Sequence, residues 1–405
     1  MPDELTTIDA AREAVLERTD RTGTERVPLV DCPGRVLAQA VVASEQVPGF
    51  DNSAMDGFAV RAVDVAGAPT ELEVADEARA GHPAEHGVHA REAVAISTGA
   101  PMPAGADAVV RVEDSDPVGP FSHRVRIKVG VEAGVNVRRA GDDIESGDRL
   151  LDPGDVLDAA AAGVLASVGI RSVECFRRPR VKVLCTGDEL IGVDGEPFPG
   201  SVRNSNAHTI PALARAAGAD ASVIERVGDQ AEATVAAIRE GLDADLLAIC
   251  GGVSVGRHDH VKDALAELGV EKVFWGVSLK PGKPLYFGSG PGGHVLGLPG
   301  NPVSAFVTFL LFARPALRVM QGSDPGIDRV GARLAEAYEK PGDRAHAVRC
   351  RLELDERGWT AHPAPRQGSH VLTSMVGIDG LAIVPAEVER VAAGETVEVE
   401  LVKAW

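Results

Sequence analysis

The sequence predicts a multidomain protein of α/β plus β structure, built around a three-layer α/β domain. Residues 180–322 alternate strand and helix patterns with short connections, which is typical of a parallel sheet covered by helices on both faces. Residues 25–137 are short β-type runs broken by Gly and Pro, and residues 326–405 lack helical periodicity and read as a small all-β domain. A chain of 405 residues exceeds one ordinary core, so two to four domains are expected.

The N-terminal part predicts two helices that flank the β-rich stretch. The first is expected over 7–19, where Thr6 and Asp9 have capping-box spacing and Ile8, Val15 and Leu16 form an apolar face. The second is expected over 157–168. We therefore interpret residues 25–137 as an insertion between two pieces of one helical region.

Four strand and helix pairs make up the α/β part. The expected strands are 180–187, 221–227, 245–252 and 294–300, and the expected helices are 206–218, 229–242, 259–269 and 301–321. In such folds ligands bind at the carboxyl ends of the strands.

Composition restricts the class of protein. The net charge is −19, the acids are spread along the chain, and only eight of the 41 basic residues are Lys. An excess of acidic residues together with few lysines suggests a protein that stays soluble in a high-salt cytoplasm. The sequence also argues against duplex nucleic acid as a partner, because no basic patch is visible. No apolar run approaches the roughly 20 residues that span a bilayer. We expect a cytoplasmic protein that binds neither membrane nor nucleic acid.

The five cysteines are far apart and form no C-x-x-C pair. Cys185 and Cys250 lie in apolar runs and are expected to be buried small hydrophobic residues, not metal ligands or disulfide partners.

Glycine and polar residues follow three of the predicted strands. They are Thr186, Gly187, Asp188 and Glu189; then Gly251, Gly252, Ser254, Gly256 and Asp259; then Pro299, Gly300, Asn301, Pro302 and Ser304. Backbone N–H groups in such loops, with a helix N-terminus behind them, suit an anion. Any one loop could be an ordinary cap or turn, but three at one edge with two acids favour a site.

The stretch "KPGKP" at 280–284 adds cations. Lys280 and Lys283 are two of only eight lysines, so an oxyanion or phosphate role is favoured over a solvated turn. The "GSGPGG" stretch at 288–293 resembles a dinucleotide fingerprint, but a strand follows it, so a hairpin loop is expected. No P-loop is present, and His258 and His260 are expected to be bystanders.

Residues 48–60, "PGFDNSAMDGFAV", combine turn residues and two carboxylates with apolar side chains that could be buried. The segment is either an ordinary connection into a strand or a rigid loop that presents Asp56.

Eight motifs together resemble the molybdopterin molybdenumtransferases of the MoeA and gephyrin E-domain family. They are "FDNSAMDGFAV", "STGAPMPAGADAVV", "RRAGDDIESGD", "TGDEL", "GGVSVGRHD", "KPGKP", "GLPGNPVS" and "QGSH", in that order. The resemblance implies an elongated domain split between 1–45 and 138–178, a β-rich insertion over 46–137, a molybdopterin-binding α/β domain over 179–325 and a C-terminal β-barrel over 326–405.

The resemblance also implies an activity and partners. The reaction would be insertion of molybdate into adenylylated molybdopterin, with release of AMP and dependence on Mg²⁺ or another divalent cation. A homodimer is implied, with molybdopterin adenylyltransferase and molybdoenzyme maturation proteins as candidate partners.

Site residues are carried over motif by motif. Expected catalytic carboxylates are Asp56, Asp143, Glu189, Asp229 and Asp259, of which Glu189 and Asp259 could hold Mg²⁺. Expected substrate-binding residues are Thr98, Gly251, Gly252, Ser254, Lys280, Lys283, Pro299, Gly300, Asn301, Pro302, Ser304, Arg349 and Ser374.

Several of these residues have structural alternatives. Asp229 heads a helix and equally suits an N-cap, and Asp143 could merely fix a Gly-rich turn. "MVGIDGLAIVP" lacks the Asn expected beside Arg349 and Ser374.

Three rival functions stay open at this point. The first is a molybdopterin adenylyltransferase, but such a protein would lack the surrounding domains. The second is insertion of tungstate in place of molybdate. The third is a non-catalytic gephyrin-like scaffold, which would not need Asp56, Glu189, Asp259 and both lysines.

Overall fold

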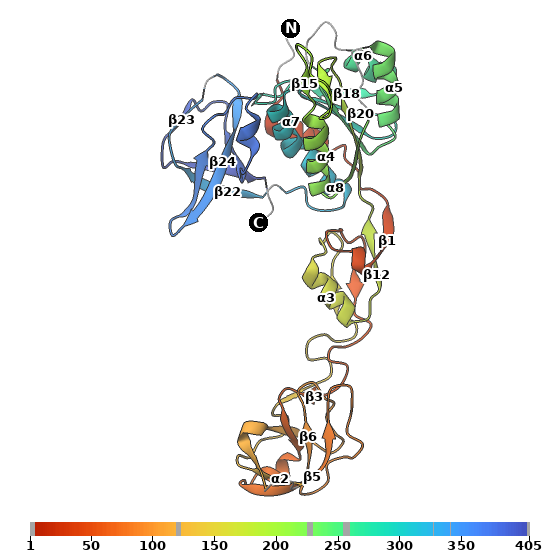
Figure 1. The fold of residues 1–405 in the computed structure, drawn as a ribbon, viewed down its shortest axis with the longest axis vertical. Coiled ribbons are helices and arrows are strands. Elements are labelled where there is room, and N and C mark those ends of the chain that lie inside the picture. The colour runs from red at the N-terminus through yellow and green to blue at the C-terminus, as the bar shows by residue number, and fades with distance from the viewer. Residues whose placement is uncertain are drawn as a thin grey trace.

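A computed structural model describes residues 5–118, 123–224, 230–253, 260–326, 328–340 and 342–402. The molecule is long (Figure 1). The α/β domain and the C-terminal barrel lie side by side at one end, a small domain with β1, β12 and α3 forms the middle, and the β-rich insertion forms the other end. The sequence-based fold class is therefore confirmed.

The α/β domain is built on a six-stranded sheet of order β16-β13-β17-β21-β20-β18. The strands are β13 (Arg180–Cys185), β16 (Asp220–Val223), β17 (Leu246–Cys250), β18 (Glu271–Trp275), β20 (Tyr286–Ser289) and β21 (His294–Leu298). Strands β16, β13, β17 and β21 are parallel, as expected. Strands β18 and β20 run antiparallel to their neighbours, because β20 and β21 form a hairpin around the predicted Gly-rich loop.

Helices cover both faces of this sheet, in agreement with the three-layer prediction. Strand side chains alternate between the faces, so that Val181 and Val183 join one core and Leu184 joins the other. The first core includes residues of α1 (Ile8–Leu16), α4 (Asn206–Ala216) and the continuous run of α7 (Pro302–Thr308), the π-helix Phe309–Ala313 and α8 (Arg314–Met320). The second core includes residues of α5 (Ala231–Gly241) and α6 (Val261–Glu267).

The run Pro302–Met320 is long and apolar enough to cross a membrane by length and composition alone, with mean hydropathy 1.5. However, 83% of its apolar window is buried inside the protein, as in the core helix of a globular domain.

The first helix differs from its prediction in its cap and its place. Thr7, not Thr6, is the N-cap, and its side chain accepts a hydrogen bond from Ala10 N at 3.2 Å. Thr6 instead exchanges backbone hydrogen bonds with Gly276 and Ser278. These bonds hold α1 on the α/β sheet, so the β-rich insertion is not framed by two helices.

The middle domain is framed instead by the antiparallel strands β1 (Thr24–Pro28) and β12 (Ser172–Phe176). Helix α3 (Ala159–Ser167) packs with them, and its N-cap Asp158 accepts from Ala161 N at 2.8 Å. Its smaller elements are the 3₁₀ turn Leu29–Asp31 and the pair β2 (Val41–Val42) and β11 (Arg149–Leu151).

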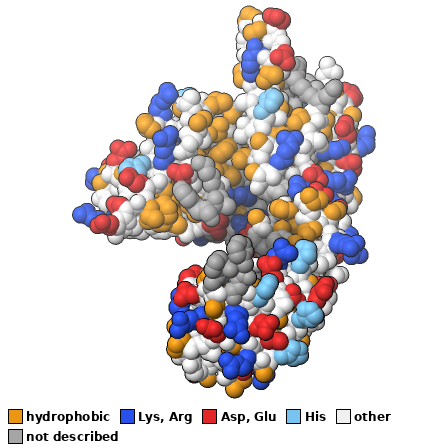
Figure 2. Space-filling view, turned by 60° about the horizontal axis from the view of Figure 1, so that its bottom comes forward, with side chains coloured by type: hydrophobic (Ala, Val, Ile, Leu, Met, Phe, Trp, Pro, Cys, Tyr) orange, Lys and Arg blue, Asp and Glu red, His pale blue; other side chains and the backbone are white. Residues whose placement is uncertain are grey.

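The insertion is a six-stranded sheet of order β7-β4-β6-β5-β9-β8 with apolar clusters on both faces. Its elements are β4 (Gly57–Val60), α2 (Ala62–Val65), β5 (Thr70–Ala78), β6 (Glu92–Ile96), β7 (Ala108–Arg111), the 3₁₀ turn Val112–Asp114, β8 (Ser115–Pro117) and β9 (Arg124–Ile127). The pair β3 (Asn52–Ser53) and β10 (Val137–Arg138) lies beside it. Among the described residues on the face seen in Figure 2, acidic and basic side chains are interspersed over this end.

The C-terminal domain is a closed five-stranded barrel, because β24 pairs with both β25 and β26. The barrel strands are β22 (Arg329–Leu334), β24 (Ala345–Asp355), β25 (Gly358–Pro363), β26 (Gly380–Val384) and β28 (Thr396–Leu401). Smaller elements are β23 (Tyr338–Glu339), β27 (Arg390–Val391) and the 3₁₀ turn Leu372–Met375. A short strand of the α/β domain, β19 (Leu279–Lys280), adds to β24 in parallel and joins the two domains.

Candidate functional site

Three loops meet at the carboxyl edge of the α/β sheet. Cys185, Cys250 and Leu298 are aligned in register on neighbouring parallel strands, so the loops that follow them start at one level. Thr186 N donates to Cys250 O at 3.2 Å, and Gly251 N donates to Leu298 O at 3.1 Å. The predicted convergence of these loops is therefore present in the structure.

Gly251 and Gly252 allow this close approach. Both have positive φ, +93° and +65°. A Cβ on Gly251 would lie 2.9 Å from Thr186 O, and one on Gly252 would lie 2.4 Å from Val261 Cγ2. The loop can therefore present backbone N–H groups only with glycine at these two positions.

Glu189 is an exposed side chain on the first loop. Its carboxylate packs against Gly187, where a Cβ would come within 2.5 Å of Glu189 Oε2. Val202 N donates to Glu189 O at 2.7 Å and ties this loop to β15 (Val202–Arg203), which pairs with β14 (Leu190–Ile191). The exposed carboxylate has no hydrogen-bond or ion-pair partner among the described residues, so it can meet a ligand or a cation at this edge.

Asn206 belongs to the same edge, although the sequence did not single it out. Its Nδ2 donates to Gly300 O at 2.9 Å, which fixes the third loop. Its Oδ1 is buried and has no hydrogen-bond partner among the described residues. A buried acceptor without a donor is costly, so Asn206 Oδ1 is a candidate acceptor for a ligand N–H or O–H.

The third loop leads directly to the barrel. Pro299 is buried and Gly300 is exposed, and Pro302 and Ser304 open the long helical run, with Ser304 buried. Asn301 Nδ2 donates to Ser369 Oγ at 3.1 Å, across the boundary between the domains. Ser369 was not among the predicted site residues. It lies in "QGSH", one of the eight motifs that carry the family resemblance, and this motif was the sequence signal that could have identified it.

The two lysines are placed differently. Lys280 is half-buried in β19 and lies opposite His346 of β24, whereas Lys283 is exposed. A cavity of about 310 Å³ is lined by Lys280 and Pro281 from one domain and by barrel residues that include Tyr338, Gln367 and Gly368. Lys280 therefore lies where the α/β domain meets the barrel.

Arg349 contacts two residues that line this cavity, because its backbone is hydrogen-bonded to the Gln367 side chain and its Nη2 lies near Gly368 O. The side chain is fully buried, at 0% exposure. Its Nε donates to Ser374 Oγ at 2.9 Å, while Nη2 has only long contacts of 3.4 and 3.5 Å to Gly368 O and Arg366 O. Nη1 is buried and has no hydrogen-bond partner among the described residues.

Burial lowers the pKa of Arg349 to about 10, and Arg349 still carries its charge at neutral pH. Within the described ranges no carboxylate pairs with it, which is unusual because a buried charge is normally paired. Ser374, a buried residue of the 3₁₀ turn, stays hydrogen-bonded in its own right, since its Oγ donates to Val371 O at 2.5 Å. The hydrogen bond between Arg349 and Ser374 is therefore present although "MVGIDGLAIVP" lacks the expected Asn.

Asp56 and Thr98 are brought together at the other end of the molecule. Asp56 Oδ1 accepts from Thr98 N at 2.7 Å, and Ser53 Oγ fixes the turn through Met55. The turn is therefore rigid and presents an exposed carboxylate. Ala59 and Val60 are buried as expected, but Phe50 and Met55 are exposed, at 50% and 43%.

Asp143 lies near the link between the insertion and the middle domain. Its backbone N donates to Val47 O at 3.0 Å, and its side chain is exposed. The carboxylate that fixes this turn is Asp142, which accepts from Arg139 N at 2.6 Å. Three further predicted residues, Asp229, Ser254 and Asp259, lie outside the described residues.

The described part of the chain contains no cluster of three or more His, Cys, Asp or Glu side chains that could hold a metal ion by itself. Magnesium typically uses only one or two carboxylates with substrate phosphates and water. The exposed Glu189 carboxylate beside a Gly-rich loop fits that donor set.

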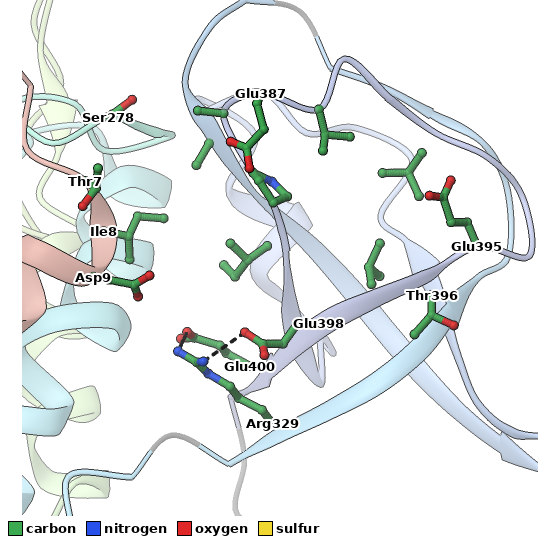
Figure 3. A pocket seen from close by; sticks show the side chains of 17 residues that line it. Thr7, Ile8, Asp9, Ser278, Arg329, Glu387, Glu395, Thr396, Glu398 and Glu400 are labelled. Carbon is green, nitrogen blue, oxygen red and sulfur yellow. Dashed lines mark hydrogen bonds and ion pairs between the residues drawn. The ribbon is translucent and has the colours of Figure 1, made fainter.

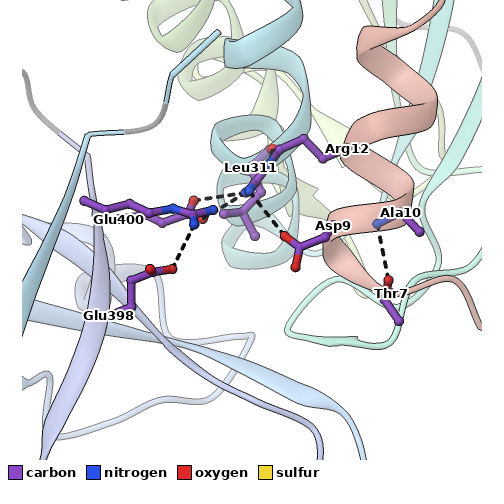
Figure 4. A network of polar contacts seen from close by, with 8 residues as sticks. Thr7, Asp9, Ala10, Arg12, Leu311, Glu398 and Glu400 are labelled. Atoms are coloured by element: carbon purple, nitrogen blue, oxygen red, sulfur yellow. Dashed lines mark hydrogen bonds and ion pairs between the residues drawn. The ribbon is translucent and has the colours of Figure 1, made fainter.

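Another cavity, of about 670 Å³, is lined by none of the predicted site residues. It separates the start of α1 from the barrel, and Thr7, Asp9, Glu387 and Glu398 face it (Figure 3). Its floor carries an ion-pair network that joins the two domains (Figure 4). In this network Arg12 of α1 and Arg329 of β22 both bind Glu400.

Cys185 and Cys250 are buried and free, as predicted, and so are the three other cysteines. The hydrogen bond to Cys185 and burial both raise the pKa of the Cys250 thiol. Both therefore serve as packing beneath the loops.

Known proteins match nearly the full length of the chain. Family models of the MoeA N-terminal region (domain I and II), a probable molybdopterin binding domain and the MoeA C-terminal region (domain IV) match residues 6–169, 182–319 and 331–402.

The molybdopterin molybdenumtransferase of Haemophilus influenzae is 35% identical over 98% of both chains. Molybdopterin molybdenumtransferase 2 of Mycobacterium tuberculosis is 37% identical over 92% of this chain and 94% of that one. A solved MoeA structure from Pyrococcus horikoshii has a TM-score of 0.84, with 32% identity over 99% of this chain and 100% of that chain.

Proposed function

Because the chain belongs to the MoeA family, whose curated members are enzymes of molybdenum cofactor biosynthesis, we propose that it inserts molybdate into adenylylated molybdopterin and releases AMP. The observation that carries this proposal is the fully buried Arg349, whose Nη1 has no partner among the described residues. An unpaired buried cation is costly, and an oxyanion bound beside it would offset that cost.

The surrounding groups suit a tetrahedral dianion. Lys280 approaches from the α/β domain, and the Ser374 hydroxyl is already held against Arg349 Nε. Molybdate at this position would receive charge-assisted hydrogen bonds from both domains. The Asn301–Ser369 contact and the β19–β24 pairing keep the two walls together.

The pterin nucleotide would bind along the neighbouring loops. Backbone N–H groups around Gly252 and Gly300 can hold its phosphates, because the positive φ of Gly252 and its missing Cβ let a ligand approach this edge closely. Asn206 Oδ1 is available to accept one of its donors. The dithiolene end would then lie toward the barrel, where molybdate is held.

A Mg²⁺ ion fits beside Glu189, with substrate phosphate as its other ligand. When bound, it would neutralise the phosphate charge and so favour departure of AMP. Glu189 would serve as its protein ligand together with Asp259.

We propose a homodimer in which each site uses two chains. Asp56 lies in the insertion, at the end of the molecule opposite the α/β domain and barrel (Figure 1). Within one chain, Asp56 therefore cannot reach the loops that carry Glu189. A two-fold partner could supply its own insertion, with Asp56 and Thr98, to that site.

Three further features are part of the same proposal. The enzyme acts in the cytoplasm, receives its substrate from a molybdopterin adenylyltransferase, and stays soluble at high salt through its net charge of −19. Tungstate, which has the same shape and charge, is expected to bind the same groups. A purely scaffolding role is disfavoured, because a partner peptide would not require a buried unpaired arginine.

The test is direct. Purified protein is mixed with adenylylated molybdopterin and molybdate or tungstate, with and without Mg²⁺, and AMP release and metal content of the pterin are measured. We expect AMP release that depends on both the oxyanion and Mg²⁺. Protein that binds the pterin nucleotide but releases no AMP with either oxyanion would contradict the proposal.

A further inference from the structure

A second cavity of about 390 Å³ lies on the barrel, on the other side of the Ser374 turn. Arg351, His362 and Arg366 are its charged or titratable lining residues, and Thr373 and Ser374 supply hydroxyl groups. The rest of the lining is Pro, Ala, Val and Ile, and no carboxylate belongs to it. The chain has 60 acidic and 41 basic residues, yet all three charged or titratable groups that line this cavity are basic.

The two arginines are not engaged by acids. Neither guanidinium forms an ion pair within the part of the chain that the structure describes. Arg366 Nη2 has only a 3.4 Å contact to Thr373 Oγ1, inside the same cavity. Arg351 packs beneath Gly377, where a Cβ would lie 3.0 Å from Nη2 and φ is +73°. His362, by contrast, is paired with Glu353 at 3.1 Å.

Ser374 is shared between this cavity and Arg349. Its buried hydroxyl lines the cavity and accepts from Arg349 Nε at 2.9 Å. Arg366 is shared as well, since its carbonyl lies 3.5 Å from Arg349 Nη2. The wall between the outer cavity and the fully buried, incompletely bonded Arg349 is therefore a single layer of residues.

We propose that this cavity is an outer binding site for a tetrahedral oxyanion, held by Arg351, Arg366 and the Thr373 hydroxyl. This inference deepens the proposed function, because it supplies a docking place for the anion next to the inner site at Arg349. A concave basic site raises the local concentration of an anion that the net negative charge would otherwise repel. Two arginines in fork geometry suit the oxygens of molybdate, tungstate or a phosphate ester.

The experiment is a calorimetric titration with sodium tungstate of wild type, Arg349→Met, the double variant Arg351→Met Arg366→Met, and the combined triple variant. We expect two sites in wild type, one in Arg349→Met, one in the double variant and none in the triple variant. Each outer arginine alone should weaken the outer site about tenfold. Arg357→Met, at the exposed β24–β25 turn outside this cavity, is the matched control and should bind as wild type does.

The outcomes separate the two proposals. A double variant that binds tungstate with wild-type stoichiometry and heat overturns the outer site and leaves the proposed function standing. An Arg349→Met variant that binds as wild type overturns the inner site and leaves the outer one standing. Circular dichroism and melting curves confirm that each variant is folded.

Inorganic phosphate and AMP, titrated into Arg349→Met, identify the source of the anion. Displacement of tungstate by AMP assigns the outer site to a phosphate ester. Tungstate binding that neither compound displaces assigns it to the metal oxyanion. If tungstate, inorganic phosphate and AMP all fail to bind Arg349→Met, the proposal of an outer site is wrong.

Discussion

Arg12 Nη2 donates to both carboxylate oxygens of Glu400, at 3.0 and 3.1 Å, and this ion pair ties the first helix of the α/β domain to the last strand of the barrel. Arg12 Nε also donates to Leu311 O at 3.1 Å, in the π-helical segment of the run that begins with Pro302. Arg329 binds the same Glu400 from the barrel side at 3.0 Å. The pair thus helps to set where the barrel, and with it Arg349, stands relative to Lys280.

Glu400→Ala should be strongly destabilising. Glu400 is only 3% exposed, and its loss leaves the buried Arg12 without a buried carboxylate partner, which typically costs about 3–5 kcal/mol. Glu398→Ala is the matched control, because Glu398 pairs with Arg329 at 3.1 Å but is 54% exposed, and such surface pairs are worth about 1 kcal/mol or less. Denaturant unfolding measures both, and equal losses would show that Glu400 is not a structural tie.

Gly252→Ala should distort the loop edge. The new Cβ would lie 2.4 Å from Val261 Cγ2, at a φ of +65° that costs a non-glycine residue about 1–2 kcal/mol before any clash. Gly300→Ala is the control on the facing loop, since its Cβ would meet nothing closer than Gly251 Cα at 3.6 Å. We expect a lower melting temperature and weaker pterin nucleotide binding for Gly252→Ala only. Two variants that both behave as wild type would argue against a packed loop edge.

His294 should make stability fall on mild acidification. Burial lowers the pKa of His294 below its ordinary value of 6.5, although nearby Asp20 opposes the shift. A histidine whose folded pKa is depressed is protonated more readily in the unfolded chain. The contribution of neutral, buried His294 to the free energy of unfolding is therefore complete above about pH 6.5. This contribution is lost as the pH falls below that value. His294→Gln should show a smaller drop in melting temperature than wild type between pH 7 and pH 5, and an equal drop would contradict this assignment.

Mixed dimers test whether two chains build each site. Asp56→Asn and Glu189→Gln homodimers should both lack insertion activity. In a heterodimer of the two, a shared-site arrangement gives one site with both changes and one with neither, so about half the wild-type turnover should return. An isolated, folded heterodimer without activity would show that Asp56 does not serve the partner's site.

Hydrophobic periodicity and strand-to-helix alternation predicted the three layers of the α/β domain, because burial on both faces leaves a clear pattern. The hairpin at β20–β21 was also predictable, since a strand follows "GSGPGG". The place of α1 was not. An amphipathic helix shows which face is buried, but its pattern does not show which sheet covers that face.

The candidate site was predictable where close packing leaves no room for a Cβ and so requires glycine, as at Gly251 and Gly252. Asn206 could not be found in this way, because polar residues are common at the start of a helix. Only the structure shows that its Oδ1 is buried without a donor from any described residue. The cavity at Arg351 and Arg366 depends on segments that fold together only in the barrel. The resemblance could name Arg349 and Ser374, but only the structure shows that Arg349 Nη1 has no hydrogen-bond partner in the described part of the chain.

We infer that Arg349, which pairs with no carboxylate in the described ranges, lowers the stability of the ligand-free protein and binds the oxyanion. The most direct measurement is the melting temperature of wild type and Arg349→Met, with and without tungstate. Arg35→Met is the control, because Arg35 is also buried but is paired with Glu25 and Phe176 O. Replacing a buried ion pair by apolar side chains is often neutral or stabilising by about 1–4 kcal/mol, and a buried charge without a carboxylate partner costs still more to keep.

We therefore predict that ligand-free Arg349→Met melts at or above the wild-type temperature, whereas Arg35→Met melts below it. Tungstate at about 100 times the dissociation constant of the Arg349 site should add about 2.7 kcal/mol through that site to wild type and Arg35→Met, and this contribution should be missing from Arg349→Met. If Arg349→Met melts well below wild type and still gains the full stabilisation from tungstate, Arg349 is a structural residue and the account is wrong.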